Sequence, residues 1–280
     1  MPEVILRGDC LGLMKYWKNT ATLDHLVPEL LDTVDAAEAE MAVIGSKPIN
    51  LSEMPNLKAI FKCGVGVDNV PFDEAKKRDI QVILPSEQTK SYIFEETANF
   101  AVHLIIMMLY KDLGSVENWV KNQREFLGQK KVLVLGLGNI GRQVANKLSP
   151  LVPVLTYDPL ENAENELEDL FRQADAITLH MPLLDSTRGF VNAEKLSWMK
   201  DGSALINTAR GPIVEEQSLY EEIKQGRIFA AFDVFWQEPY EGILRQFHPA
   251  RFVMTPHVAS NCSNFLDGLA LDFNNFLVSS

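Results

Sequence analysis

The sequence predicts an α/β protein built from two doubly wound parallel sheets, with one domain inserted into a smaller one. Two observations support this prediction. Short apolar runs of β-type composition alternate with helical patterns along the 280 residues, which is typical of βαβ units. The pattern changes near Phe94, where apolar residues at helical spacing continue to about Leu113 and predict a long buried connector helix.

Residues 1–93 are expected to form the smaller domain, with a flavodoxin-like arrangement of strands and helices. A last helix over 263–280 is expected to return and pack on it. The predicted strands are Val4–Leu6, Ala42–Gly45, Leu57–Lys62 and Ile80–Leu84, and the predicted helices are Thr22–Leu31 and Phe72–Arg78.

Residues 94–262, connector helix included, are expected to form the inserted domain. Six apolar runs with crossovers between them predict a complete doubly wound sheet of the Rossmann type. The predicted strands are Lys131–Leu135, Val154–Tyr157, Ala176–Leu179, Ala204–Asn207, Ala230–Asp233 and Arg251–Met254, and the clearest helices are Ile140–Leu148 and Val214–Gln225.

Composition limits the classes of function. Hydrophobic residues make up 46% and charged residues 23% of the chain, which is ordinary globular usage. The formal net charge of −12 argues against a nucleic-acid-binding or anionic-membrane surface. Three widely spaced cysteines predict neither a disulfide framework nor a zinc site, and no signal-peptide pattern is visible. We therefore expect a cytoplasmic protein without a metal, nucleic-acid or membrane partner.

A glycine motif predicts a dinucleotide site. Residues 131–141 read KVLVLGLGNIG, in which an apolar strand runs into G-x-G-x-x-G and a helix follows. Gly136 permits the tight turn, Gly138 lets a pyrophosphate approach the backbone, and Gly141 allows helix and strand to pack closely. The helix N-terminus then offers N–H groups to the phosphates. The expected contacts in this loop are Gly136, Gly138, Asn139, Ile140 and Gly141.

An acid at the end of the next strand indicates which dinucleotide is bound. Asp158 lies 22 residues after Gly136, and a carboxylate at about this spacing is expected to hydrogen-bond the adenosine ribose diol. The same carboxylate would repel a 2′-phosphate, so we predict NAD rather than NADP. The alternative is a tight strand–helix turn with a turn-capping aspartate, which the strand–turn–helix–strand–acid order disfavours.

Three later strands each lead into a polar residue suited to catalysis. Arg210, Glu238 and His257 follow the strands that end near residues 207, 233 and 254, and ligands bind at the carboxyl ends of strands in open parallel sheets. A guanidinium can bind a carboxylate through two hydrogen bonds, and a histidine oriented by a carboxylate can exchange a proton. Each residue taken alone is better explained as an ordinary surface or loop residue.

Four motifs after GLGNIG resemble the D-isomer-specific 2-hydroxyacid dehydrogenase family over about residues 40–260. They are HMPLLDSTRGFVN at His180–Asn192, INTARGPIVEEQSL at Ile206–Leu219, FDVFWQEP at Phe232–Pro239 and TPHVA at Thr255–Ala259. The resemblance implies that Arg210 binds substrate, that His257 is the acid/base and that Glu238 is its partner. One departure is the short segment between Pro159 and Glu168, where the family fits more structure.

The resemblance also assigns further contacts. It implies that the backbone of Gly64, Val65 and Gly66 binds the substrate carboxylate, and Lys47 occupies a position where some members place a basic residue near the substrate. Thr97 is implied to contact the cofactor near its phosphate, Asp233 to lie near its carboxamide, and His180 to support it from a strand end. The remaining implied cofactor contacts are Pro182, Thr208 and Ala209.

We thus expect an NAD-dependent oxidoreductase that acts on a small anionic D-2-hydroxy acid or 2-oxo acid. Two alternatives stay open: an NAD-sensing, corepressor-like binding protein without turnover, and a dehydrogenase of a phosphorylated acid or of phosphite. The second alternative would involve Lys47 and Lys62. Trp119 and the apolar connector helix also predict a surface that pairs with a second copy, so we expect a homodimer.

Overall fold

The computed structural model describes residues 4–6, 37, 39–46, 48–162 and 164–279. The chain divides into two compact units, Met1–Ile93 with Ser260–Ser280 and Phe94–Ala259. The second boundary lies three residues before the predicted one. The predicted helix Thr22–Leu31 and the candidate Lys47 lie outside the described residues.

A four-stranded parallel sheet forms the centre of the first unit. Its strands are adjacent in the order β1 (Val4–Leu6), β2 (Met41–Ile44), β3 (Ala59–Lys62) and β4 (Gln81–Ile83). Every residue of β2 and β3 is buried, because helices or loops cover both faces of a parallel sheet. The 3-10 helix η2 (Leu51–Glu53) and the helix α2 (Phe72–Lys77) belong to this unit as well.

Two longer helices contribute to the first unit, α8 (Ser263–Ser279) as a whole and α3 (Glu87–Leu109) up to Ile93, and α3 begins earlier than predicted. α3 spans Glu87–Leu109, not Phe94–Leu113, because Ser86 accepts a hydrogen bond from the Thr89 amide and starts the helix at that point. The return helix α8 (Ser263–Ser279) covers the predicted range. The two helices approach closely where Gly268 faces Thr89, since a Cβ at Gly268 would lie 2.6 Å from the Thr89 hydroxyl.

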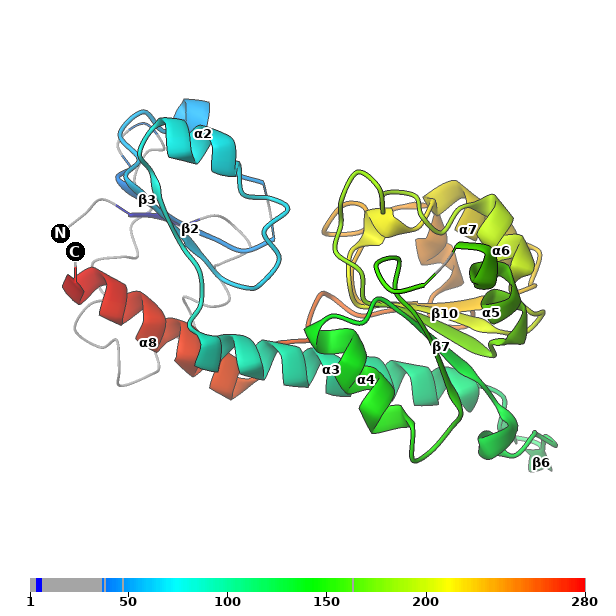
Figure 1. Cartoon of the computed structure of the whole chain (residues 1–280). Helices are drawn as coiled ribbons and strands as arrows, with labels where there is room; N and C mark the ends of the chain where they lie inside the picture. The colour runs from blue at the N-terminus through cyan, green and yellow to red at the C-terminus, as the bar shows by residue number, and fades with distance from the viewer. Residues whose placement is uncertain (1–3, 7–36, 38, 47, 163, 280) are drawn as a thin grey trace. The chain divides into compact units, whose positions relative to one another are not determined.

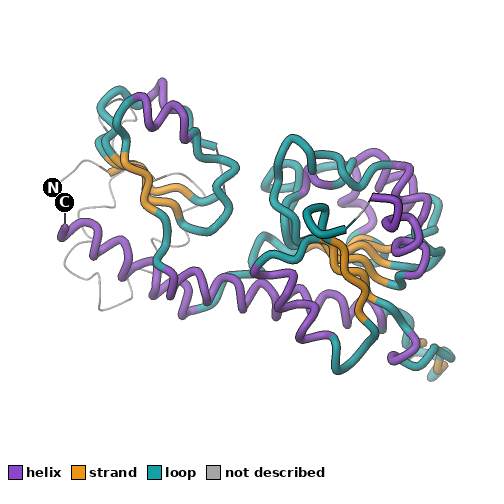
Figure 2. Tube along the Cα trace, viewed as in Figure 1, coloured by secondary structure: helices purple, strands orange, loops and turns teal. Residues whose placement is uncertain are grey.

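A six-stranded parallel sheet forms the centre of the second unit, and Figure 2 shows its strands in orange between helices. Along the sheet the order is β12-β11-β10-β9-β7-β8. The strands are β7 (Val132–Leu135), β8 (Val154–Tyr157), β9 (Ala176–Leu179), β10 (Ala204–Asn207), β11 (Phe229–Phe232) and β12 (Phe252–Met254).

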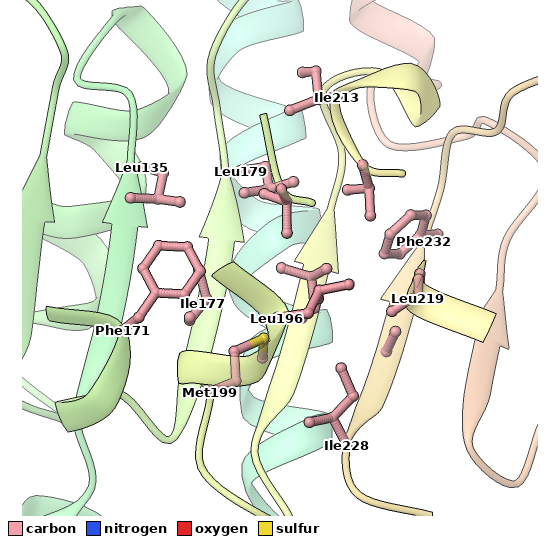
Figure 3. Packing of buried hydrophobic residues seen from close by; sticks show 14 of the residues in the cluster. Leu135, Phe171, Ile177, Leu179, Leu196, Met199, Ile213, Leu219, Ile228 and Phe232 are labelled. Carbon is pink, nitrogen blue, oxygen red and sulfur yellow. The ribbon is translucent and has the colours of Figure 1, made fainter. Parts of the chain in front are cut away.

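Helices cover both faces of this sheet, α3 and α4 on one and α5, α6 and α7 on the other (Figure 1). Successive strand residues alternate between the faces, so every strand must be apolar on both sides. On the second face, Phe171 of α5, Leu196 of α6 and Leu219 of α7 pack on sheet residues such as Ile177 (Figure 3). The helices are α4 (Asn139–Leu148), α5 (Leu167–Gln173), α6 (Ala193–Trp198) and α7 (Glu216–Lys224), with 3-10 helices η3 (Leu127–Gln129), η4 (Glu164–Glu166), η5 (Gly211–Ile213) and η6 (Ile243–Phe247).

The face with α3 explains the unusual composition of that helix. By length and composition α3 could span a membrane. Its Ala98, Leu104 and Ile105 are instead buried against strand residues such as Val134, so α3 is a core helix of the second unit.

The sheet has two strands rather than three on one side of its reversal point, which differs from the complete doubly wound sheet that we predicted. A six-stranded Rossmann sheet places three strands in each half. Here β8 lies at the edge, and the chain passes from it through a short segment and α5 directly to β9 on the far side of β7. The segment between Pro159 and Leu167 is too short for a further strand and crossover.

A two-stranded hairpin that sequence did not predict joins α3 to β7. Its strands are β5 (Gly114–Ser115) and β6 (Val120–Lys121), and Figure 1 shows it at the margin of the second unit. Strands of two residues are too short for an apolar alternation to reveal them.

Leu205 of β10 tests the contribution of the sheet core, because its side chain is fully buried in the middle of the sheet. We expect Leu205→Ala to lower the free energy of unfolding by about 2–5 kcal/mol, from lost burial and a cavity. Urea titration followed by circular dichroism measures this. Leu184→Ala is the matched control: that side chain is 55% exposed, and the change should stay within about 0.5 kcal/mol. Equal losses for both variants would contradict the packing described.

Candidate active site

The parallel sheet brings the three predicted polar residues to one edge. β10, β11 and β12 are neighbours, and Arg210, Glu238 and His257 lie in the loops that follow their carboxyl ends. The first two loops touch each other, since a Cβ on Gly211 would lie 2.1 Å from the carbonyl carbon of Phe235. Any larger residue at 211 would push the Arg210 and Glu238 loops apart.

His257 and Glu238 form the central contact of this site. The Nδ1 of His257 lies 2.8 Å from Oε2 of Glu238, while the second oxygen, Oε1, accepts a hydrogen bond of 3.1 Å from the Phe235 amide. Both carboxylate oxygens therefore have a partner, which fixes the carboxylate and in turn the imidazole ring. His257 has a φ of +53°, a left-handed conformation that a non-glycine residue adopts at a cost.

A buried aspartate holds the segment that carries His257. Asp233 is fully buried and accepts hydrogen bonds from the Thr255 hydroxyl (2.6 Å) and from the amides of Val258 and Ala259 (2.9 Å each). Burial raises the pKa of the Asp233 carboxyl, and these hydrogen bonds oppose the increase. Asp233, which the resemblance implies to lie near the cofactor carboxamide, thus also supports the loop that carries His257. Its partners are 22 to 26 residues away in the sequence, so no sequence spacing predicts these hydrogen bonds.

The loop with Glu238 is anchored by aromatic side chains. The indole nitrogen of Trp236 donates to the Val214 carbonyl at 2.7 Å, and the Tyr240 hydroxyl donates to Glu216 at 2.6 Å. The Tyr240 ring stacks on Phe235 with 4.9 Å between centroids. Burial and the bond to Glu216 raise the pKa of the Tyr240 hydroxyl, so it stays protonated as a donor.

Arg210 is held through its backbone. The fully buried Asn207 accepts from the Ala209 amide at 2.9 Å and donates to the Arg210 carbonyl at 2.8 Å. The Arg210 guanidinium donates to the Ala209 carbonyl at 2.7 Å. Asn207 is a supporting residue that the sequence analysis did not single out. The residue after it, Thr208, has a side-chain oxygen that is buried and, across the described part of the chain, is the one such atom without a hydrogen-bond partner.

The glycine loop lies where the strand order reverses, between β7 and β9. Gly136 has a φ of +93°, and a Cβ on it would lie 2.8 Å from the carbonyl carbon of His180. A Cβ on Gly141 would lie 1.9 Å from the Gly136 oxygen. A Cβ on Gly138 would meet nothing within 4 Å, and the helix begins there with Asn139 and Ile140. Space above Gly138, beside a helix N-terminus, fits a pyrophosphate.

Asp158 connects the edge strand to the glycine loop. Its Oδ2 accepts from the Leu137 amide at 2.7 Å and its Oδ1 accepts from the Leu160 amide at 3.0 Å. A carboxylate has about four acceptor positions, so it can still accept hydrogen bonds from a ribose diol. The residues at this edge, together with the buried Thr208 hydroxyl, thus fit a dinucleotide.

His180 is a part-buried residue that directly follows β9. Its Nε2 lies 2.9 Å from the Thr178 hydroxyl, and burial lowers the pKa of the imidazole to about 3. Nearby, Pro182 is an exposed residue, and its carbonyl accepts a hydrogen bond from the Thr187 hydroxyl at 2.6 Å. Thr97, the other predicted contact of the second unit, is buried on α3.

The first unit carries the second predicted anion site. Gly64 and Gly66 follow β3, and Gly64 has a φ of +135° that favours glycine. Under this turn Lys62 is buried, and its ammonium donates to the Gly45 carbonyl, which also accepts from Asn69 at 2.9 Å. A Cβ on Gly64 would lie 3.8 Å from the Lys62 Nζ, so a positive charge lies close beneath the turn.

Comparisons with known proteins agree with this arrangement. Residues 105–259 match the family model for the NAD-binding domain of D-isomer-specific 2-hydroxyacid dehydrogenases. The chain is 33% identical over 220 residues to a hydroxypyruvate reductase of Thermotoga maritima, covering 74% of this chain and 72% of that protein. It is 35% identical over 226 residues to a D-3-phosphoglycerate dehydrogenase of Archaeoglobus fulgidus, covering 74% of this chain but 42% of that longer protein.

Solved structures show the same fold. The chain resembles the D-lactate dehydrogenase of Aquifex aeolicus, solved with NAD and lactic acid, with a TM-score of 0.76 and 23% identity. The match covers 99% of this chain and 94% of that one. The chain thus shares its fold, with two parallel-sheet domains, with a solved structure.

The neutral state of His180 predicts a pH dependence of stability. The folded imidazole takes up a proton only near pH 3, whereas its ordinary pKa is 6.5. Between these values the unfolded chain binds more protons, so the free energy of unfolding falls as pH falls, by up to about 1.4 kcal/mol per pH unit. We expect His180→Gln to show a shallower fall between pH 6.5 and 4 in urea titrations. Parallel slopes for variant and wild type would contradict a buried neutral His180.

Proposed function

Because the chain belongs to the D-isomer-specific 2-hydroxyacid dehydrogenase family, we propose that it transfers a hydride between NAD(H) and C2 of a small D-2-hydroxy acid or 2-oxo acid. The contact between His257 Nδ1 and Glu238 Oε2, 2.8 Å long and on the same sheet edge as the glycine loop, is the main support. The nicotinamide cofactor supplies or accepts the hydride when it is bound.

His257 is the proposed acid/base. Glu238 accepts a hydrogen bond from Nδ1–H, which fixes the tautomer and the orientation of the ring. Nε2 is then the atom that gives a proton to the carbonyl oxygen at C2 during reduction, or removes it from the hydroxyl during oxidation. In this proposal Asp233 and Asn207 keep the two loops in place, so that the proton is exchanged at a fixed position.

Arg210 is the proposed substrate cation. Its planar guanidinium can bind the substrate carboxylate through two hydrogen bonds and polarise the neighbouring carbonyl. The turn of Gly64, Val65 and Gly66, with the buried Lys62 ammonium beneath it, is proposed to bind a substrate carboxylate through backbone amides. Lys47 stays a proposed contact of the substrate.

Cofactor binding is proposed to use residues that follow five strands of the second unit, β7 to β11, and one residue of α3. The glycine loop binds the pyrophosphate, and Asp158 binds the adenosine ribose, which favours NAD over NADP. Among the proposed cofactor contacts, Thr208 has the clearest support, because its buried hydroxyl has no hydrogen-bond partner in the described part of the chain. The full proposed set is Thr97, Gly136, Gly138, Asn139, Ile140, Gly141, Asp158, His180, Pro182, Thr208, Ala209 and Asp233.

The hairpin between α3 and β7 is the proposed surface for a second copy of the chain. Val116, Trp119 and Phe126 are 83%, 78% and 76% exposed, a concentration of apolar side chains that a lone soluble surface rarely carries. A twofold dimer would bury these side chains. We also propose a cytoplasmic location.

Turnover and its dependence on His257 test the proposed function. We expect NADH oxidation with at least one member of a panel of glyoxylate, hydroxypyruvate, pyruvate and 3-phosphohydroxypyruvate. His257→Ala should lower kcat by about 10²–10⁴-fold while NADH binding stays nearly unchanged. His103→Ala, on an exposed position of α3, is the matched control and should keep full activity. NADH that binds but is never oxidised would instead favour a sensor without turnover.

Light scattering after size-exclusion chromatography tests the dimer. We expect a mass of twice 31.5 kDa for the wild type and a shift toward 31.5 kDa for Trp119→Ser, because the interface loses its largest exposed aromatic side chain. Leu184→Ser removes an exposed apolar side chain elsewhere and should leave the dimer intact. A monomeric wild type would overturn this part of the proposal.

A further inference from the structure

We propose that Glu161 is a second determinant of cofactor choice, which acts by occupying Arg142 and so suppresses a site for the 2′-phosphate of NADP. This inference rests on the proposed function, since it concerns the adenosine end of the same dinucleotide site. It adds to Asp158 a residue pair that the sequence motif does not include.

The pair bridges the edge strand loop and the first turn of α4. The Arg142 guanidinium lies 2.7 Å from Oε1 of Glu161. Arg142 is the residue directly after the last glycine of the motif, and its amide donates to the Gly138 carbonyl at 3.1 Å. Arg142 therefore lies in the first helical turn after the loop that is expected to hold the pyrophosphate, with its guanidinium at the turn that follows β8.

Glu161 and Asp158 belong to one tight turn. The amides of Glu161 and Asn162 both donate to the Asp158 carbonyl at 2.9 Å, and the Asn162 side chain accepts from the Asp158 amide at 2.9 Å. From this turn Asp158 reaches the Leu137 amide and Glu161 reaches Arg142. Two acids and one arginine thus surround the place where the adenosine ribose is expected.

In dinucleotide-binding folds an acid at this position selects the free 2′-hydroxyl, whereas a nearby arginine accommodates the 2′-phosphate. This chain has both groups. Glu161 shifts the preference toward NAD, because an arginine that is paired with a carboxylate attracts a phosphate only weakly. Removing the carboxylate would leave a guanidinium close to the expected position of the phosphate.

The exposed turn after β8 does not exclude a 2′-phosphate by steric contact. Discrimination against NADP must therefore come from electrostatic repulsion. β8 is the edge strand, and the Leu160 side chain in the turn is 95% exposed. The Arg142 and Glu161 side chains are 60% and 52% exposed. Exposed ion pairs contribute little to stability, so the effect of Glu161 on phosphate affinity should be a few-fold rather than absolute.

Direct binding of both cofactors tests this proposal without relying on turnover. The dissociation constants of NADH and NADPH are measured by isothermal titration calorimetry for the wild type and for Glu161→Gln. We expect the wild type to favour NADH, and Glu161→Gln to lower the NADPH constant about two- to fivefold, the range that corresponds to an exposed ion pair. The gain should shrink at high salt, where exposed charges are screened.

Two further variants separate the pair from a general charge effect. Glu168→Gln removes the same charge from another exposed Arg–Glu pair, with Arg172 at 2.6 Å, and should leave the NADPH to NADH ratio unchanged. Arg142→Gln combined with Glu161→Gln should show no gain for NADPH. An unchanged NADPH constant in Glu161→Gln, or the same gain in either of these two variants, would overturn the proposal. Failure of the wild type to bind NADH would refute the proposed function instead.

Discussion

Parallel pairing of six buried strands is the constraint on which the second unit depends. All six strands run in one direction, so their carboxyl ends and the loops after them meet at one edge. Because helices cover both faces, the central strands are almost entirely apolar, and the charged groups of the proposed site follow the strand ends. The same rule that builds the core therefore collects the chemical groups in one place.

Loops at that edge need internal support, and buried polar side chains supply it. Asp233 and Asn207 are fully buried, and each bonds to the backbone or hydroxyl groups of the loop beside it. A buried carboxylate or amide without partners would be costly, so the loop conformation and the side chain stabilise one another. Glycine contacts act in the same way: Gly211 lets two loops touch, and Gly136 lets the glycine loop contact the residue after β9.

Charge is distributed unevenly in a chain whose net charge is −12. The proposed substrate groups are cationic, with Arg210 in one unit and the buried Lys62 in the other, and both are kept beside backbone carbonyls. At the adenosine end the acids Asp158 and Glu161 dominate instead. A dinucleotide with an unmodified ribose and a small anionic substrate match these two environments.

The sequence by itself determined where the strands lie and which of them end in polar residues, because four-residue apolar runs and the GLGNIG turn are local patterns. It also identified Arg210, Glu238 and His257 through motifs. Only the tertiary structure decided the strand order, with β8 at the edge, and the geometry of the contact between His257 Nδ1 and Glu238 Oε2. It likewise decided that Asp233 braces the imidazole loop and that Glu161 pairs with Arg142. The reason is physical: local patterns fix backbone conformation, whereas partners distant in sequence are chosen by packing of the whole sheet.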